Sequence, residues 1–396
     1  MKQVASLRRS LSLFQITLYG IGTILGAGIY VLLGEVASIS GMATPLAFLV
    51  SAIIVSFSAY AYAQLSSRFP QSAGEAVYVA EGLRVNALAT LVGIAIVLGG
   101  IVSSATLLNG FIGYFKFFMP LPKSLLVIVI VSLFCSLACW GVKQSVGMAV
   151  ITTLIEIVGL LMVFASGSEQ ISSQGINWKG FAAADIGSLP IISGAFLAFY
   201  AFIGFEDMVN MAEEVKNPRR NLPIAIFLAL IITTLLYATV AIVALSIVPL
   251  EQLSSSEAPL ALVVEQGGLF SPGVMAFIGI VAILNGAMIQ MIMASRVLYG
   301  MANNALIPKL LGYVSPRTRT PTIATILVGI LVATFALWFP LVTLAQATSS
   351  LVLLVFILVN LSLAAINWRE RRWFRLTIPL TGSILCATFA GLQLLN

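Results

Sequence analysis

Three acidic residues of this chain lie in or directly after apolar segments. Glu156 lies within the apolar stretch 151–164, far from either polar end, and Glu206 and Asp207 lie two and three residues after Gly204. An ionised carboxylate in an apolar membrane segment costs several kcal/mol, so such groups are protonated or paired and are functional by default. We predict that Glu156 binds a proton. A neutral, hydrogen-bonded structural carboxyl is the alternative.

The main chain of residues 16–34 could bind an anionic group. This apolar stretch carries five glycines, and each costs a helix interior about 1 kcal/mol relative to alanine. The segment can therefore unwind near Gly26, Ala27 and Gly28, where free N–H groups at the start of a half-helix suit a carboxylate. Close helix packing through the Gly22/Gly26 pair is the alternative. The five glycines are Gly20, Gly22, Gly26, Gly28 and Gly34.

The elements that hold these groups are membrane spans. The chain has 396 residues, of which 60% are hydrophobic and 9% charged, with a mean hydropathy of +1.08. A soluble domain carries about 25% charged residues, so the composition predicts an integral membrane protein with several spans. The net charge of +6 does not indicate nucleic-acid binding, because the basic residues cluster in short polar breaks between spans.

The residue types argue against an enzyme or a metal site. The chain contains no histidine, no cluster of metal ligands and no Gly-x-Ser-x-Gly motif. Cys135 and Cys139 have the spacing of a metal pair, but no further thiol lies nearby, so all three cysteines are interpreted as small buried residues. We expect no cofactor and no metal.

Eleven apolar segments have spanning length. If the N-terminus is cytoplasmic, all of the 20 basic residues lie inside except Lys116, Lys123 and Lys179. This arrangement predicts a multi-pass protein of the cytoplasmic membrane whose C-terminus lies outside, with a first span that is not a cleaved signal. The segments are 12–36, 42–66, 87–115, 123–141, 147–166, 189–212, 223–248, 272–300, 322–338, 342–366 and 376–394.

Three connections have a predicted form. Residues 167–188 should be an irregular outer loop, and residues 249–271 should form short helices over an outer vestibule. Residues 70–81 read as an amphipathic helix that lies on the inner membrane surface.

The sixth span mirrors the first, because Gly204 interrupts it in its middle. Interrupted spans at matching places in two halves indicate a transporter built from inverted repeats. We therefore predict an all-α membrane domain over 1–396, with one repeat at 12–166, a second at 189–366 and an extra span at 376–394.

Three motifs resemble the amino acid–polyamine–organocation (APC) transporters. They are Gly26-Ala-Gly-Ile-Tyr30, the run Phe202-Ile-Gly-Phe-Glu206 with the following stretch 212–223, and the stretch 294–308 with Arg319-Thr-Pro321. The resemblance implies a leucine-transporter-type five-plus-five fold, alternating access and amino acid substrates. Many members have a twelfth span, which we do not expect here, so a monomer and a homodimer both remain open.

The resemblance also implies residue roles. Gly26, Ala27 and Gly28 would hold the substrate carboxylate, through main-chain donors only because alanine stands where serine is frequent. The carbonyl of Ile24, with those of Phe199, Tyr200 and Ile203 at the Gly204 break, would face the substrate ammonium, and Tyr200 would be the outer aromatic gate.

Other roles concern coupling and selectivity. Relatives often carry lysine at the position of Glu156, and Glu206 matches an acidic position linked to proton sensing. Asp207 is expected to pair with an inner arginine, and Gln290 would read the substrate side chain. Further polar candidates are Ser103, Ser104, Asn285 and Ser295.

The predicted function is secondary transport of L-amino acids, coupled to protons through a buried glutamate. Exchange of amino acids or polyamines without proton coupling is the alternative, and a channel is a distant third because no selectivity filter is recognisable. The apolar residues near Gln290 favour neutral amino acids, whereas Glu206 would favour cationic ones if it faced the pocket.

Overall fold

The computed structural model describes residues 9, 11–71, 74–140, 146–176, 189–212, 214–303, 307–315 and 320–395. These residues form helices, and the only β-bridge among them joins Leu11 and Val215. The long helices are α1 (Leu13–Ala27), α2 (Ile29–Ser40), α3 (Thr44–Arg68), α5 (Asn86–Lys116), α6 (Lys123–Trp140), α7 (Val146–Gln174), α9 (Leu189–Tyr200), α10 (Pro218–Ile247), α13 (Pro272–Asn303), α14 (Thr322–Trp338), α15 (Leu341–Arg369) and α16 (Thr377–Leu395). The short ones are η1 (Gly41–Ala43), α4 (Gly74–Leu83), η2 (Glu206–Met211), α11 (Leu250–Ser255), α12 (Pro259–Gly267), η3 (Lys309–Gly312) and η4 (Trp373–Arg375).

The helices identify a polytopic membrane protein. Within the described residues, seven helical stretches are long and apolar enough to cross a membrane. Four shorter apolar helices, at Leu13–Gly26, Lys123–Cys139, Leu189–Tyr200 and Thr322–Trp338, accompany them. Each of the eleven predicted segments coincides with one helix or with a broken pair of helices.

The first predicted span is broken, as the glycines indicated. α1 begins with a capping box between Ser12 and Gln15, and it gives way to α2 at Gly28, whose φ and ψ are −106° and −88°. A Cβ atom at Gly28 would lie 2.7 Å from the Cα atom of Ala201 and 2.6 Å from the Tyr237 hydroxyl. Only glycine therefore lets this break approach the sixth span so closely.

The sixth predicted span is broken as well. α9 ends at Tyr200, turns through 201–205 and continues as the 3₁₀ helix η2. Gly204 has a φ of +126°, a conformation that side chains with a Cβ rarely adopt. A Cβ there would also meet the Thr23 carbonyl at 2.8 Å. Both the backbone conformation and the close contact therefore require glycine at this position.

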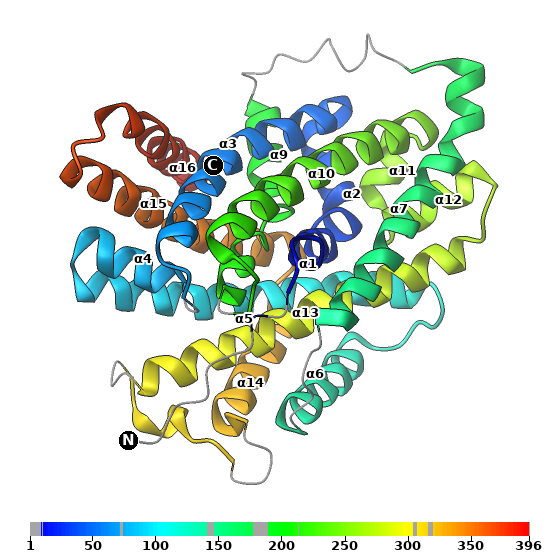
Figure 1. The fold of residues 1–396 in the computed structure, drawn as a ribbon. Helices are drawn as coiled ribbons and strands as arrows, with labels where there is room; N and C mark the ends of the chain where they lie inside the picture. The colour runs from blue at the N-terminus through cyan, green and yellow to red at the C-terminus, as the bar shows by residue number, and fades with distance from the viewer. Residues whose placement is uncertain are drawn as a thin grey trace.

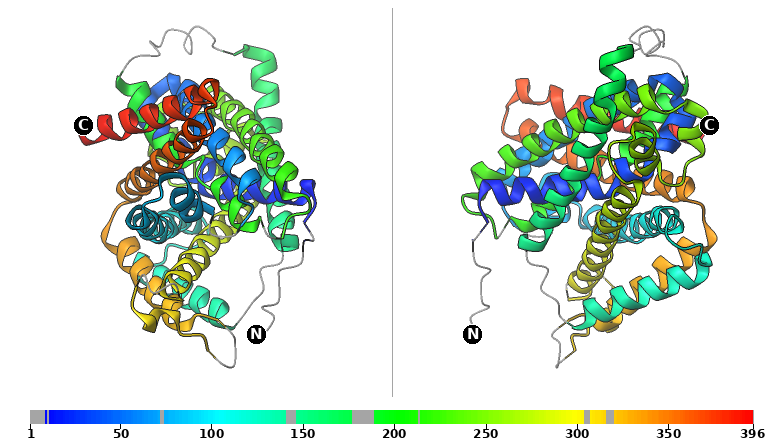
Figure 2. Two further views of the ribbon diagram at one scale, coloured as in Figure 1. Left: turned by 60° about the vertical axis from the view of Figure 1, so that its left-hand side comes forward. Right: turned by 90° about the vertical axis from the view of Figure 1, so that its right-hand side faces the viewer.

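The two broken spans lie in the interior of the bundle (Figure 1). α1 packs against α7, α10 and α13, and the long helix α13 packs in turn against α5. α15 packs against α5, and α16 covers α15 and α3 at one edge of the molecule, as the views of Figure 2 also show. The broken segments are thereby shielded from lipid by other helices, which is the condition for irregular backbone at membrane depth.

Two of the predicted connections differ in the structure. α7 continues to Gln174, so the predicted irregular loop at 167–188 was wrong for its first part, and residues 177–188 lie outside the described residues. The helices α11 and α12 confirm the short helices predicted for 249–271.

The predicted surface helix at 70–81 is α4, and its placement differs from the prediction. One face of α4 is buried against α5 and α15, with Glu75, Tyr78 and Val79 at most 3% exposed. The spacing of these residues puts them on a single helical face. This face enters the bundle because it carries two large apolar side chains, and it brings the Glu75 carboxyl with it.

Candidate functional site

The two helix breaks contact each other directly. The Thr23 hydroxyl donates a hydrogen bond to the Gly204 carbonyl at 3.0 Å. The Tyr237 hydroxyl of α10 lies 2.8 Å from the Ile24 carbonyl and 2.9 Å from the Ala201 carbonyl, one in each break. Unwound backbone inside a membrane protein needs such internal partners, and these contacts provide them.

Replacing Tyr237 by phenylalanine should therefore destabilise the junction of the breaks. The ring is fully buried, so the substitution leaves two interior carbonyls without their shared donor. We expect a loss of about 1–3 kcal/mol in the free energy of unfolding, measured by thermal unfolding of the purified protein. Tyr313→Phe, at a 48% exposed tyrosine, is the matched control. Equal stability of the two variants would contradict the bridging role.

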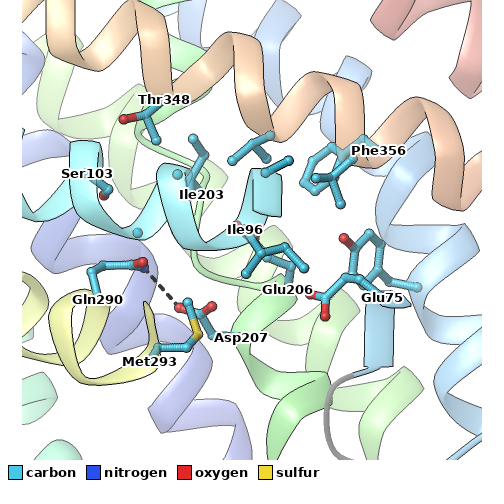
Figure 3. A pocket seen from close by; sticks show the side chains of 16 residues that line it. Glu75, Ile96, Ser103, Ile203, Glu206, Asp207, Gln290, Met293, Thr348 and Phe356 are labelled. Carbon is cyan, nitrogen blue, oxygen red and sulfur yellow. Dashed lines mark hydrogen bonds between the residues drawn. The ribbon is translucent and has the colours of Figure 1, made fainter. Parts of the chain in front are cut away.

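A small cavity lies beside the second break (Figure 3). Six segments contribute to it: α3, α4, α5, the turn and η2 of the sixth span, α13 and α15. The lining residues are Tyr62, Glu75, Ala95, Ile96, Gly99, Gly100, Ser103, Ile203, Glu206, Asp207, Gln290, Met293, Thr348, Val352, Val355 and Phe356.

Four predicted site residues meet at this cavity: Ser103, Ile203, Glu206 and Gln290. They come from α5, the sixth span and α13, which are far apart in sequence. Glu206 also accepts a hydrogen bond from the Gly204 N–H at 2.8 Å, so its carboxyl is tied to the break itself. The cavity and the second break are thus one local structure.

Three acidic side chains line the cavity (Figure 3). Glu75, Glu206 and Asp207 are 3%, 8% and 2% exposed. No described arginine forms the ion pair predicted for Asp207; its carboxylate accepts a hydrogen bond from the Gln290 amide at 3.1 Å. Asp207 is turned into the bundle because η2 winds as a tight 3₁₀ helix directly after the break. Among the described residues, none of the three carboxyls has an ion-pair partner.

An aromatic cluster closes the cavity next to the acids. The ring of Tyr62 lies edge-on to Phe205 and Phe356, with centroids 5.4 Å from each, and 6.2 Å from Tyr78. The hydroxyl groups of Tyr62 and Tyr78 are buried and have no hydrogen-bond partner among the described residues. Polar groups without partners are rare in protein interiors and need an explanation.

The α5 wall of the cavity is formed by glycines. A Cβ atom at Gly99 would meet nothing within 4 Å, so this position faces open space. A Cβ atom at the next residue, Gly100, would instead lie 3.1 Å from the Gln290 carbonyl oxygen and 3.2 Å from the Ala294 side chain. One glycine thus leaves room in the cavity while its neighbour lets α5 and α13 approach.

Tyr200 and the two serines link α5 to other helices. The Tyr200 hydroxyl lies 3.0 Å from the Ser103 hydroxyl, and its ring is fully buried. Ser104 donates to the Ala287 carbonyl of α13 at 2.9 Å, and it does not line the cavity. The Phe199 and Tyr200 carbonyls accept the N–H groups of Phe202 and Ile203 in this conformation, at 3.0 and 3.1 Å.

The remaining predicted binding residues lie away from this cavity. A Cβ at Gly26 would meet the Ala282 carbonyl of α13 at 2.9 Å, so this glycine serves close packing as well as the break. Ile24, Gly28 and Gly204 belong to the junction, and the side chain of Ala27 lies outside the described residues. Asn285 is half-buried, and Ser295 donates to the Ile292 carbonyl of its own helix.

Glu156 is buried separately on α7. It is 0% exposed, and neither carboxyl oxygen has a hydrogen-bond partner in the described part of the chain. The Tyr30 hydroxyl donates to its backbone carbonyl at 2.6 Å, and Gly159, one turn further, packs against the same tyrosine. The Glu156 carboxyl therefore lies beside α2, just after the first break.

Sequence reasoning missed Glu75 as a cavity residue. The available signal was its helical spacing to Tyr78, Val79 and Gly82, which places a carboxyl on the apolar face of a short helix. Tyr62, Gly99 and Phe356 were also missed, and they give no comparable signal, because each is an ordinary residue of an apolar helix.

The cavity has the chemistry of a binding site. It combines several carboxyls and an amide with apolar walls, as small-molecule sites usually do. In the described ranges, no three histidine, cysteine or acidic side chains lie together as metal ligands would. The two cysteines of α6 are half-buried and free.

Comparison with known proteins decides the family. A family profile described as "Amino acid permease" matches residues 11–395, nearly the whole chain. The chain belongs to the amino acid permease family. The resemblance to APC transporters is thereby confirmed, and the permease is a member of a transporter family, not an enzyme.

Relatives of the permease differ in their named substrates. It is 29% identical to the branched-chain amino acid permease BcaP of Bacillus subtilis over 92% of this chain and 82% of that protein. It is 27% identical to the methylthioribose transporter of the same bacterium over 97% and 88% of the two chains. It is 30% identical to the mitochondrial cationic amino acid transporter 3 of Arabidopsis thaliana over 91% of this chain, but it spans only 63% of that relative.

Proposed function

We propose that the permease is a secondary active transporter that moves L-amino acids across the cytoplasmic membrane by alternating access. The observation that carries this proposal is the cavity beside the second helix break, bordered by Ile203, Glu206 and Asp207. Broken helices that meet inside a bundle are the sites where secondary transporters bind substrate. The family membership supports the amino acid as the substrate class.

We further propose that the domain spans 1–396 as two inverted repeats, 12–166 and 189–366, followed by an extra span. Each repeat would begin with a broken helix, α1 with α2 and α9 with η2. The N-terminus would lie in the cytoplasm and the C-terminus outside. The substrate carboxylate would bind main-chain N–H groups near Gly26–Gly28, where α2 begins and its helix dipole is positive.

Counterflow in proteoliposomes tests this function. Vesicles that contain the purified permease are loaded with unlabelled L-leucine or L-arginine, and entry of the same labelled amino acid is followed. We expect the internal amino acid to accelerate entry, because alternating access exchanges loaded sites. Entry without such trans-stimulation would indicate a channel, and no entry for any of the twenty amino acids would refute the proposal.

Proton coupling is proposed to run through Glu156. Its carboxyl is fully buried without a hydrogen-bond partner among the described residues, so an ionised form would lack any compensation in this state. The group would hold a proton here and release it when the bundle rearranges. Exchange without proton coupling remains the competing mechanism.

The variant Glu156→Gln should lose accumulation driven by a pH gradient. Glutamine keeps the shape of the protonated acid but cannot release a proton, so the accumulation ratio should fall to about one while counterflow persists. Glu169→Gln, at an exposed acid on the same helix, is the control. Unchanged gradient-driven accumulation in Glu156→Gln would exclude the proton role and favour the exchanger.

A further inference from the structure

The cavity holds three carboxyls that form no ion pair with any described lysine or arginine. We propose that Glu75, Glu206 and Asp207 form a subsite that binds the positively charged side-chain group of a basic amino acid. The subsite lies toward α4 and α15, away from the Gly26–Gly28 segment assigned to the carboxylate. This inference rests on the proposed transport function and names its substrate class.

Burial of the acids is the first argument. All three carboxyls are at least nine-tenths buried, and they come from two segments that are far apart in sequence, α4 and η2. Each lies within electrostatic range of at least one of the others. Buried charges are stable when they are paired, and no Lys or Arg among the described residues pairs with these.

An unused hydroxyl is the second and independent argument. Tyr62 lines the same cavity, is 0% exposed, and its hydroxyl has no hydrogen-bond partner in the described chain. This hydroxyl is within electrostatic range of all three carboxyls. A hydroxyl can accept a hydrogen bond from an ammonium or guanidinium group, so a basic ligand would satisfy it together with the acids.

The remaining walls suit a basic side chain. Ile96, Val352 and Phe356 provide apolar surface beside the acids, and Gly99 leaves open space in the wall opposite α15. Lysine and arginine carry an apolar stem that packs on such surfaces while the charged end reaches polar groups. A metal ion is disfavoured, because no three acidic side chains in the described ranges have metal-ligand spacing.

Protonation of Glu75 makes the affinity of the subsite for a cation depend on pH. This residue lies on α4, outside the membrane-spanning helices, and burial together with the Glu206 carboxyl raises its pKa to about 8. The ionisable groups that face it are Glu206 and Asp207 from η2, Tyr62 from α3 and Tyr78 from α4. The cavity residues of α5, α13 and α15 are uncharged, and Arg296 lies exposed further along α13.

A cation must displace the Glu75 proton below that pKa. Glu75 should therefore make the affinity for L-arginine rise as the pH is increased from 6 to 8, by at most about tenfold per pH unit from this one group, and its contribution should level off above 8. A neutral ligand should show no such slope from this group.

Binding to the purified wild-type permease is the first test. Ligand-induced stabilisation is measured with L-arginine, with its uncharged isostere L-citrulline, with L-lysine and L-norleucine, and with sodium chloride. We expect the two basic amino acids to stabilise the protein at concentrations at least about tenfold lower than their neutral counterparts. Equal effects of the charged and neutral members would overturn the proposal. Stabilisation by sodium chloride alone would replace the organic cation with a metal ion.

Carboxyl variants locate the effect. Glu75→Gln should weaken L-arginine binding at least about tenfold and remove the part of its pH slope between 6 and 8 that Glu75 contributes. Glutamine mimics the protonated acid, so the fold should be retained. Glu81→Gln, at an exposed acid on the same helix, should bind L-arginine like the wild type. Wild-type affinity in Glu75→Gln would remove this residue from the subsite and refute the proposal.

The outcomes separate this inference from the transport function itself. Counterflow of L-leucine without preferential L-arginine binding would leave the transporter in place and remove the cation subsite. Absence of counterflow for every amino acid would remove both.

Discussion

Gly204→Ala is expected to yield a permease that is poorly folded and inactive in counterflow. The φ of +126° places any side chain with a Cβ in a strained conformation, which costs about 1–3 kcal/mol. The new methyl group would also lie 2.8 Å from the Thr23 carbonyl, and overpacking of this kind costs a further 1–3 kcal/mol or so. The Thr23 carbonyl belongs to the backbone, so it cannot relieve the contact by changing a rotamer.

Thermal unfolding and counterflow measure this effect. Gly391→Ala on α16 is the control, because a Cβ atom there meets nothing within 4 Å and the helix should be stabilised slightly. If Gly204→Ala unfolded and exchanged like the wild type, the close contact between the two breaks would be wrong.

Gly99→Phe is expected to abolish transport and leave the fold intact. Gly99 lines the cavity and a Cβ atom there would meet nothing within 4 Å, so a side chain at this position starts in open space and its phenyl ring enters the cavity. Filling apolar space tends to preserve or raise stability. We expect counterflow to fall below about a tenth of the wild-type rate, because the ring occupies the volume that substrate needs.

Two further variants distinguish a blocked cavity from a destabilised fold. Gly99→Ala adds only a methyl group and should retain counterflow, and Gly391→Phe introduces the same ring on α16, away from the cavity. Unfolding midpoints show whether Gly99→Phe is folded. A folded Gly99→Phe that exchanges amino acids at the wild-type rate would exclude this cavity from the transport path.

The helix breaks could be predicted from sequence because their cause is local. Glycine weakens a helix wherever it stands, so the glycine run around Gly28 and the single Gly204 identified both breaks within a few residues. The end of α7 was harder to predict, since residues 167–174 are polar and their helix simply continues beyond the apolar stretch.

The contents of the cavity could be predicted only in part, because they depend on tertiary packing. Asp207 and Gln290 were each recognised as polar residues of their spans, but they are 83 positions apart and nothing local pairs them. Glu75 was placed on the membrane surface, because its helix is short and amphipathic. Only the packing of α4 against α5 and α15 shows that its buried face enters the protein.

The reciprocal contact of the two breaks has a consequence for the history of this family. The missing side chain of Gly28 leaves space for Ala201, and that of Gly204 leaves space for Thr23. Each glycine is therefore needed because of a residue in the other half of the chain. A larger residue on either side can be accommodated only by a change across the junction. We therefore expect these four positions to co-vary among relatives, although they are distributed over two halves separated by more than a hundred residues of sequence.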